Sequence, residues 1–272
     1  MKIGASSMFL WDSEVDQLAL KLPAIGLDTL DVWFDSPSLY LKDEEIVRTK
    51  LDIIRQAAIS IVSHIASHDL NPCSYNVEVR KLTYRLAQKS ILFAAAMGAE
   101  FATIHGGYNS FGKECSDYDK TLFFEYLRNL IDWNPTDVIL TIENSPAEHY
   151  KLLNSPAIVL EFLEEFKELQ LTFDYAHVAS KILNVWKKAL HQFSDRLAIV
   201  HLSNPNQEHH RLKFDKAISA FLAWLKRKAP NVILILEYEQ EHLIKDPMKV
   251  LEEDARKLRR SWRGIETRES SP

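Results

Sequence analysis

Residues 138–146 read VILTIENSP, an apolar and β-branched run that stops abruptly on a carboxylate, Glu143. Such a run predicts a short, buried β-strand. The residues after Glu143 are Asn, Ser and Pro, which favour a turn. An acid at the end of one strand is ordinarily a solvated residue or a helix cap. The interpretation of Glu143 therefore depends on whether the other strands of the chain end in the same way.

The pattern of a short apolar run followed by a longer helical stretch recurs along the whole chain. We expect strands at residues 2–5, 29–33, 60–64, 101–105, 138–143, 171–174, 198–201 and 232–237. Helical spacing is clear at residues 77–97, 218–225 and 247–258. Gly26 and Gly98 precede two of the strands, at positions where glycine commonly ends a helix.

This alternation of strands and helices predicts βαβ units and a parallel sheet. Eight such units fit a chain of 272 residues, and the phosphate-binding motifs G-x-G-x-x-G and G-x-x-x-x-G-K-[ST] are absent from the sequence. We therefore predict a single (β/α)8 TIM barrel rather than a doubly wound sheet. In this interpretation residues 1–262 form the barrel, and residues 263–272 are a frayed C-terminal tail.

The composition is that of a soluble globular protein, with 46% hydrophobic and 26% charged residues. A net charge of −5 disfavours nucleic acid or an anionic membrane as a partner. The N-terminal residues MKIGASSMFLW lack the apolar core of a signal peptide, and no run of 18 apolar residues occurs. We interpret the widely separated Cys73 and Cys115 as free thiols, which agrees with a cytoplasmic protein. A homo-oligomer is compatible with this sequence.

The ends of the expected strands carry the residues suited to chemistry. Six successive strands each end with a histidine or a carboxylate, namely His64, His105, Glu143, Asp174, His201 and Glu237. All strand ends of a parallel barrel meet at one face, so these side chains are expected to lie close together. Clustered charges there are costly unless they are paired, and a divalent cation would compensate them. Mixed His, Asp and Glu donors suit Zn²⁺, Mn²⁺, Fe²⁺ or Co²⁺ better than Ca²⁺, and they also admit Mg²⁺.

Two loops supply further candidates. His177 stands three residues after Asp174, a spacing that lets both side chains face one cavity. After the seventh strand, Gln207-Glu208-His209-His210-Arg211 forms a dense group of donors. We interpret His209 as part of a polar surface loop.

Several segments, taken in order, resemble the xylose-isomerase-like TIM-barrel superfamily. These are SHIASHDLNP (63–72), AAAMGAEFATIHGGY (94–108), TIENSP (141–146), TFDYAHVA (172–179), IVHLSN (199–204) and LILEYE (234–239). The resemblance extends from Lys2 to about Leu258 and includes sugar-phosphate isomerase/epimerase-like proteins and the endonuclease IV group. For the epimerase type it implies one divalent metal ion (Mn²⁺, Zn²⁺, Mg²⁺ or Co²⁺) held by Glu143, Asp174, His201 and Glu237. It also implies a carbohydrate substrate near His177 and Arg211.

The resemblance admits three functions. The first is a sugar or sugar-phosphate isomerase or epimerase, in which Glu143 and Glu237 act as an acid–base pair on a metal-stabilised enediolate. Trp11, Trp33, Phe34 and Tyr108 would then pack against the sugar at the barrel mouth. The second is an endonuclease-type phosphodiesterase at abasic DNA, whose additional metal ligands would be His64, His105, His177, Glu208 and His210. Leu212 is followed by Lys213-Phe214-Asp215 instead of the L-G-x-G of that group. The third is a barrel that binds metal or sugar without turnover.

Overall fold

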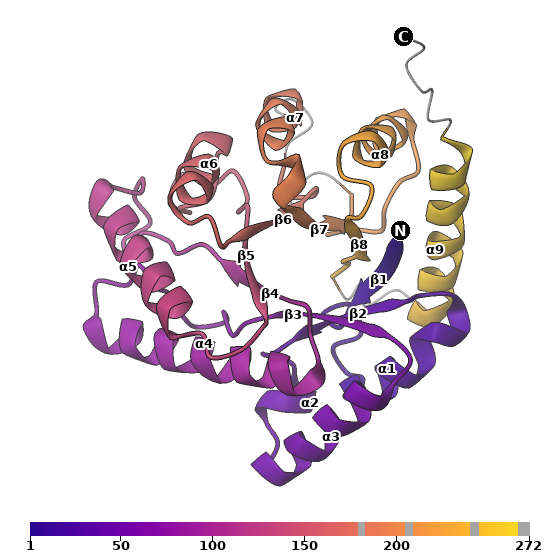
Figure 1. The fold of residues 1–272 in the computed structure, drawn as a ribbon, viewed down its shortest axis with the longest axis horizontal. Helices are drawn as coiled ribbons and strands as arrows, with labels where there is room; N and C mark the ends of the chain where they lie inside the picture. The colour runs from indigo at the N-terminus through magenta and orange to yellow at the C-terminus, as the bar shows by residue number, and fades with distance from the viewer. Residues whose placement is uncertain (179–182, 205–208, 240–244, 266–272) are drawn as a thin grey trace.

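The chain folds as a closed barrel of eight parallel strands surrounded by helices, as predicted (Figure 1). The computed structural model describes residues 1–178, 183–204, 209–239 and 245–265. The strands are β1 (Lys2–Ser6), β2 (Thr29–Trp33), β3 (Ser60–His64), β4 (Phe101–His105), β5 (Ile139–Glu143), β6 (Gln170–Asp174), β7 (Leu197–Leu202) and β8 (Ile233–Leu236). The helices are α1 (Val15–Lys21), α2 (Pro37–Tyr40), α3 (Glu44–Gln56), α4 (Val77–Met97), α5 (Asp117–Trp133), α6 (Pro156–Glu165), α7 (Leu183–Gln192), α8 (Lys216–Lys228) and α9 (Pro247–Gly264), with 3-10 turns η1 (Leu22–Ile25) and η2 (Ser194–Arg196).

The expected elements are present, and their ends differ by a few residues. β8 ends at Leu236, so Glu237 is the first residue after the strand. α9 continues to Gly264, six residues beyond its expected end, so the basic residues of 256–263 lie within this helix. Lysine and arginine favour helix, and Leu258 and Trp262 continue the buried stripe of α9. Most of the expected tail, residues 266–272, lies outside the described residues.

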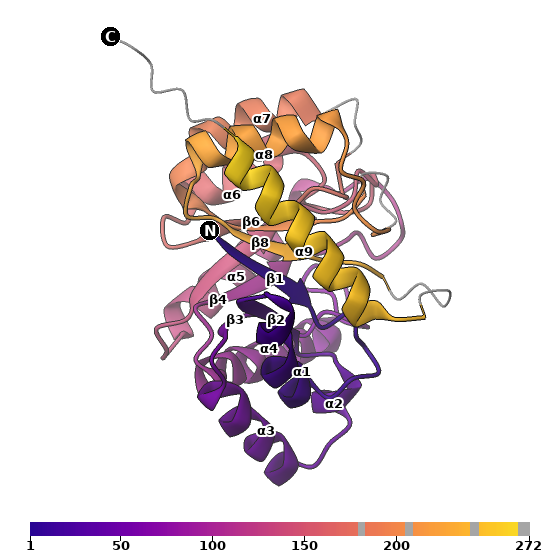
Figure 2. The same ribbon diagram turned by 90° about the vertical axis from the view of Figure 1, so that its right-hand side faces the viewer.

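Two of the helix ends follow the predicted glycine signal. Gly26 and Gly98 have φ angles of +84° and +75°, the left-handed conformation that glycine adopts without steric cost. At the start of α5, Ser116 and Asp119 form a capping box that satisfies backbone N–H groups of the first turn. α9 packs beside α8 and β1, as Figure 2 shows.

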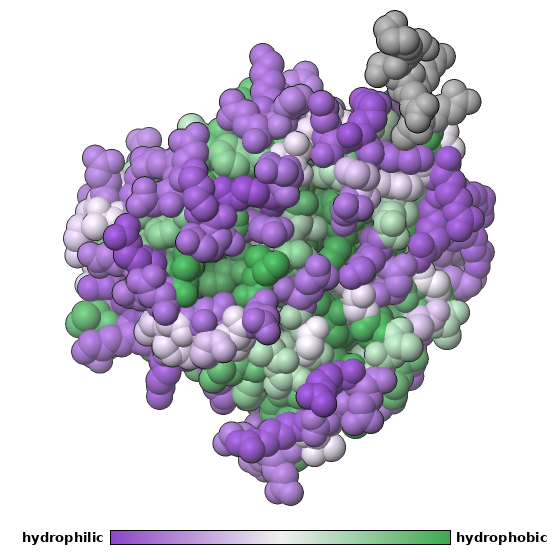
Figure 3. Space-filling view, in the orientation of Figure 1, coloured by the Kyte–Doolittle hydropathy of each residue, from purple (hydrophilic) through white to green (hydrophobic). Residues whose placement is uncertain are grey.

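Two hydrophobic cores hold the barrel together. The larger one fills the space between the strands and the surrounding helices. The smaller one lies inside the barrel and contains Val62, Phe101, Ile199, Ile233 and Ile235. On the outside, hydrophilic residues cover most of the periphery in Figure 3, and hydrophobic residues show between them near the middle of the view. None of the helices in the described part of the chain is long and apolar enough to span a membrane.

On several strands the side chains inside the barrel change from apolar near the start to charged or histidine at the end, because alternate side chains of a strand face the same side. On β5 the series is Ile139, Thr141 and Glu143. The hydroxyl of Thr141 lies 2.6 Å from that of Thr172 and 3.2 Å from that of Thr103, and the hydroxyls of Thr103 and Thr172 are 3.1 Å apart. The three hydroxyl groups therefore hydrogen-bond to one another. Above these hydroxyl groups, at the carboxyl ends of the strands, lie the charged residues.

Candidate metal centre

Seven acidic and histidine side chains converge at the carboxyl end of the barrel. They come from β2 to β7 and from the residue after β8, and they are Asp31, His64, His105, Glu143, Asp174, His201 and Glu237. All except His105 are at most 1% exposed. The closure of the barrel brings together the six strand-end residues expected from the sequence, and it adds Asp31.

Glu143 lies among three histidines. Its Oε2 is 2.9 Å from Nε2 of His105 and 3.4 Å from Nε2 of His64. Its Oε1 is 3.1 Å from Nδ1 of His201. Glu143, the carboxylate that follows the apolar run VILTI, is therefore a buried member of the cluster rather than a solvated strand terminus.

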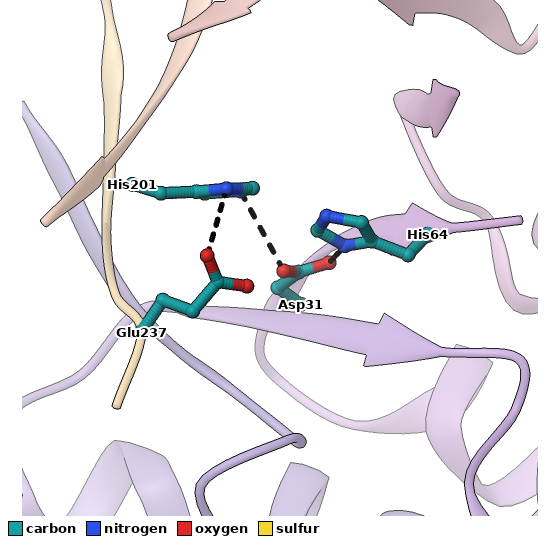
Figure 4. A group of neighbouring side chains, drawn as sticks. All are labelled: Asp31, His64, His201 and Glu237. Carbon is teal, nitrogen blue, oxygen red and sulfur yellow. Dashed lines mark hydrogen bonds and ion pairs between the residues drawn. The ribbon is translucent and has the colours of Figure 1, made fainter. Parts of the chain in front are cut away.

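Asp31 joins two of these histidines, as Figure 4 shows. Its Oδ1 is 3.0 Å from Nδ1 of His64, and its Oδ2 is 3.8 Å from Nε2 of His201. Nδ1 of His201 faces the other way, 3.1 Å from Oε2 of Glu237. Trp33, two residues after Asp31 on β2, stacks on His64 with ring centroids 4.2 Å apart. Carboxylates that orient histidines in this manner are typical of metal sites.

Asp174 and His177 are positioned through Asn144. The backbone N–H of Asp174 donates to Oδ1 of Asn144 at 2.7 Å, and the Asn144 amide donates to the Asp174 carbonyl at 3.0 Å. The ring Nδ1 of His177 is 2.7 Å from the carbonyl oxygen of Asn144. Because a carbonyl only accepts hydrogen bonds, this contact places the proton of neutral His177 on Nδ1 and leaves Nε2 as a ligand atom.

His209 also belongs to the cluster, so the interpretation of this residue as part of a polar surface loop is wrong. Its Nδ1 is 3.7 Å from Oε2 of Glu237 and 3.8 Å from Oδ2 of Asp174, and its Nε2 is 3.2 Å from Nε2 of His177. A φ angle of +26° at His209 turns the ring inward, while His210 is exposed. Glu208, the other candidate in this loop, lies outside the described residues.

Burial and the attraction between opposite charges shift the pKa values of these side chains in opposite directions. Burial raises the pKa of Glu143, but His201 and His105 outweigh it and hold that pKa well below its usual range. Burial opposes the charged form of Glu237 as well, and His201 again lowers the pKa of this carboxyl. For His64, burial lowers the pKa while Asp31 raises it, with a result of about 9. In the absence of a cation, protonated histidines thus compensate the carboxylates, and a metal ion would replace these protons.

The donor set fits a divalent cation. Ligand atoms of Glu143, Asp174, His201 and Glu237 all lie within 4.8 Å of one another. Four ligand atoms of the cluster are buried and have no hydrogen-bond partner within the described residues. They are Oδ2 of Asp31, Oδ2 of Asp174, Nε2 of His201 and Oε1 of Glu237. Buried polar atoms rarely lack partners, and a bound ion or water is the usual explanation. Three further groups satisfy the same 4.8 Å criterion: Asp31–His64–His201–Glu237, His64–His105–Glu143 and Asp174–His177–His209.

Two of the four residues expected to bind substrate, His177 and Tyr108, line a cavity, and the other two, Trp11 and Arg211, do not. A cavity of about 230 Å³ adjoins the cluster, and His105, His177 and Tyr108 line it. Trp11 packs against the ring of His68, with centroids 5.9 Å apart. Arg211 is directed elsewhere: its Nε is 2.7 Å from Asp254 and its Nη2 is 2.9 Å from Glu253, both on α9.

Trp33 and Phe34 are not free for the role expected at the barrel mouth. Both are 5% exposed. Trp33 presents one face to His64, and Phe34 belongs to a small buried cluster with Ala66 and Leu70.

Comparison with known proteins agrees with the fold. The sequence profile of a family described as Xylose isomerase-like TIM barrel matches residues 20–261. The uncharacterized protein MJ1188 of Methanocaldococcus jannaschii is 24% identical over 255 residues, which are 91% of this chain and 92% of that protein. A probable endonuclease 4 of Mycobacterium leprae is 27% identical over 120 residues, 44% of each chain.

Solved structures of sugar epimerases have the same fold. A D-tagatose 3-epimerase-like protein superimposes with a TM-score of 0.75 and 22% identity, covering 97% of this chain and 98% of the other. The 3-keto-D-glucoside 4-epimerase of E. coli superimposes with a TM-score of 0.75 and 17% identity, covering 96% and 99%. At these identities the likeness shows a common architecture.

Proposed function

This chain belongs to the Xylose isomerase-like TIM barrel family, and on this premise we propose that it is a divalent-metal-dependent sugar isomerase or epimerase. One observation carries the proposal: Glu143 and Glu237 each approach the same atom, Nδ1 of His201, at 3.1 Å. These carboxylates lie in a buried layer beside a cavity. The epimerases among proteins of the same fold support a carbohydrate substrate.

Four residues would hold the cation, namely Glu143, Asp174, His201 and Glu237. Three carboxylates and one imidazole suit Mn²⁺, Zn²⁺, Mg²⁺ or Co²⁺. When bound, such an ion acts as a Lewis acid on the carbonyl and adjacent hydroxyl oxygens of an open-chain sugar.

Glu143 and Glu237 would also move the proton. They extend from β5 and from the end of β8, and each has its pKa held low by His201. This attraction favours the ionised form that a base requires. In the proposed reaction one carboxylate would remove a proton from the carbon beside the carbonyl, and the other carboxyl group, after taking up a proton from solvent, would deliver that proton to the sugar.

The cavity would hold the remainder of the sugar. Its wall contains His177, whose Nδ1 is fixed by Asn144, so that Nε2 is the ring nitrogen left for a ligand. Tyr108 also lines it. Trp11, whose ring packs against His68, would contact the carbon face of the sugar. Arg211 has no part in this proposal, because Asp254 and Glu253 bind its guanidinium.

The proposal is tested by metal analysis together with solvent proton exchange. Chelator-free protein is expected to contain about one equivalent of a divalent metal. Incubation of this protein with ketoses in D₂O is expected to label C1 or C3. Absence of bound metal, combined with no stabilisation on metal addition, would contradict the proposal. Metal binding without exchange on any sugar would instead favour a barrel that binds without turnover.

A second candidate is phosphodiester hydrolysis at abasic DNA. Two further ligand groups favour it, because His64–His105–Glu143 and Asp174–His177–His209 offer more donors than one ion requires. The relative named probable endonuclease 4 adds support. A zinc content of about three equivalents and incision of an abasic duplex would establish this activity. Zinc content of about one equivalent without incision would dismiss it.

A further inference from the structure

Asp254 is a buried carboxylate on α9, and it is not a member of the cluster at the carboxyl end of the barrel. Its side chain is 0% exposed. Arg211 donates to both oxygens, with Nε 2.7 Å from Oδ2 and Nη2 2.8 Å from Oδ1. The hydroxyl of Tyr238 lies 3.2 Å from Oδ2, and Nζ of Lys257 lies 3.3 Å from Oδ1. A buried charge requires such pairing, and the pairing in turn fixes these donors relative to α9.

Two of the donors come from segments that carry members of the cluster. Arg211 follows His209 by two residues in the segment between β7 and α8. Tyr238 directly follows Glu237, the first residue after β8. The two segments are also joined to each other, because the N–H of Glu239 donates to the carbonyl oxygen of His209 at 3.0 Å. One carboxylate on α9 therefore holds both segments from outside the barrel.

Tyr238 and Glu237 extend in opposite directions from the chain. The Glu237 side chain reaches into the cluster, where its Oε2 lies 3.1 Å from Nδ1 of His201. Tyr238 is 1% exposed, and its ring packs edge-on against Phe9 with centroids 5.2 Å apart. Neighbouring side chains alternate in this way along a strand, and here the alternation continues past the end of β8. A shift of the Tyr238 side chain would therefore move the backbone that carries the Glu237 carboxylate.

The helix that supplies Asp254 is itself fixed to the barrel. α9 packs against α8, β1 and η1 (Figure 2). Nη2 of Arg259, one turn after Asp254, lies 2.8 Å from Oδ2 of Asp28, which precedes β2. Asp254 belongs to the same buried stripe of the helix as Leu251 and Leu258. Its carboxylate thus has a defined position from which to hold other segments.

Resting on the function proposed above, we infer that Asp254 is a positioning residue for the metal centre. Its contact with Arg211 fixes the segment of His209. Its contact with Tyr238 fixes the carboxylate of Glu237, one of the proposed ligands. The guanidinium of Arg211 is thereby used to shape the site rather than to bind the substrate.

The test measures the affinity for Co²⁺, because a positioning role predicts a change at the cluster as well as in stability. The visible absorption of bound Co²⁺ follows the titration and also reports the arrangement of the ligands. We expect Asp254→Asn to weaken Co²⁺ binding by about 10-fold, the lower end of the range for residues that orient ligands, and to alter the spectrum. Tyr238→Phe removes only the hydroxyl and keeps the packing against Phe9. A smaller loss in the same direction is expected from it, and this variant serves even if Asp254→Asn does not fold.

Three control variants separate positioning from a loss of stability. Lys257→Met removes the donor that comes from α9 itself, and Glu253→Gln removes the exposed partner of Arg211. Both are expected to keep the parental Co²⁺ affinity. Leu258→Ala removes buried contacts of the same helix, and it is expected to lower the urea midpoint while the affinity and the spectrum stay parental. If Asp254→Asn behaves like Leu258→Ala, Asp254 has only a structural role and the inference is overturned.

A double variant tests whether the effect passes through Arg211. Arg211→Met in the Asp254→Asn background is expected to add little to the loss of Co²⁺ affinity, because residues that act through one contact are not additive. Fully additive losses would contradict the inference. Since Co²⁺ binding requires no turnover, the inference is separable from the proposed activity. If Asp254→Asn loses affinity while the parent protein exchanges no sugar proton, the activity fails and the inference stands. If the parent protein binds no divalent metal, both fail.

Discussion

Asp31 contacts His64 at the bottom of the charged cluster, with 3.0 Å between Oδ1 of the carboxylate and Nδ1 of the imidazole. A carboxylate only accepts hydrogen bonds, so this contact keeps a proton on Nδ1 of His64 and turns Nε2 toward Glu143. The other oxygen of Asp31 faces Nε2 of His201, and Nδ1 of that ring faces Glu143 and Glu237. One carboxylate thus orients two histidines toward the same space.

We expect Asp31→Asn to weaken metal binding by about 10- to 100-fold while the barrel stays folded, because such orienting partners contribute that much to metal affinity. Competition with a chromophoric chelator measures the affinity, and circular dichroism checks the fold. The matched control is Asp52→Asn, which changes an exposed carboxylate on α3 and is expected to leave metal affinity unaltered. An Asp31→Asn protein with parental affinity would show that Asp31 has no orienting role.

Glu143→Gln and Glu237→Gln are each expected to lower the rate of proton exchange by about 100- to 10,000-fold, because each removes a base and a charged ligand. The measurement is deuterium incorporation into ketoses at saturating metal. Glu100→Gln serves as the control, since Glu100 precedes β4 at the opposite end of the barrel and pairs with Lys2 on the surface. Exchange at the parental rate in Glu237→Gln would remove that residue from the proposed mechanism.

The sequence was sufficient to predict the eight strands and six of the converging side chains, since each strand is a buried apolar run and the residue at its end is easily identified. Asp31 escaped because it stands in the middle of its strand, TLDVW, and strands are staggered around a barrel. The sequence did contain a signal for Asp31, because an acid within an otherwise largely apolar strand indicates a buried carboxylate with a specific partner. The surroundings of His209 and Arg211 could not be predicted from spacing along the chain. The position of His209 depends on a backbone with positive φ, and that of Arg211 depends on Asp254, which lies 43 residues away on α9.

Arg196 provides a test of stability away from the cluster. Its guanidinium donates to backbone carbonyls at the end of α6 and before β6: Nη2 lies 2.6 Å from the Phe166 oxygen and Nε lies 2.8 Å from the Leu169 oxygen. Arg196→Ala removes these donors, and the Phe166 oxygen keeps only the N–H of Leu169 at 3.4 Å. We expect the free energy of unfolding to fall by about 2–4 kcal/mol. Arg196→Lys should recover less than half, because an ammonium group cannot reproduce the planar set of donors.

Urea denaturation measures these changes in unfolding free energy. The control is Arg128→Ala, which removes an exposed ion pair with Glu165. That change is expected to cost no more than about 1 kcal/mol. Equal losses in Arg196→Ala and Arg128→Ala would show that the carbonyl contacts of Arg196 contribute nothing specific.

The contact between Asp35 and His68 predicts a pH-dependent contribution to stability. Nδ1 of His68 lies 3.1 Å from Oδ2 of Asp35, which also accepts from the backbone N–H of Ser67. Burial raises the pKa of Asp35, but the hydrogen bonds from His68 and Ser67 outweigh it and lower that pKa. The hydrogen bond to Asp35 raises the pKa of His68 above its usual 6.5.

The signs of the two shifts define the pH range in which the pair stabilises the protein. The contribution of Asp35 is present above its unfolded pKa of about 3.9 and is lost as the pH falls through the lower folded value. The contribution of His68 is present below about 6.5 and is lost as the pH rises through the higher folded value. Both are present together between about pH 4 and pH 6.5.

Asp35→Asn is therefore expected to destabilise the protein more at about pH 5.5 than at about pH 8.5. The difference should be about 0.5 kcal/mol, a small value because the His68 side chain is half exposed. Urea denaturation at the two pH values measures it, and the pH dependence of all other groups cancels when variant and parent are compared. In a His68→Gln background the same substitution should cost equal free energy at both pH values, and a persistent difference there would assign the effect to another group.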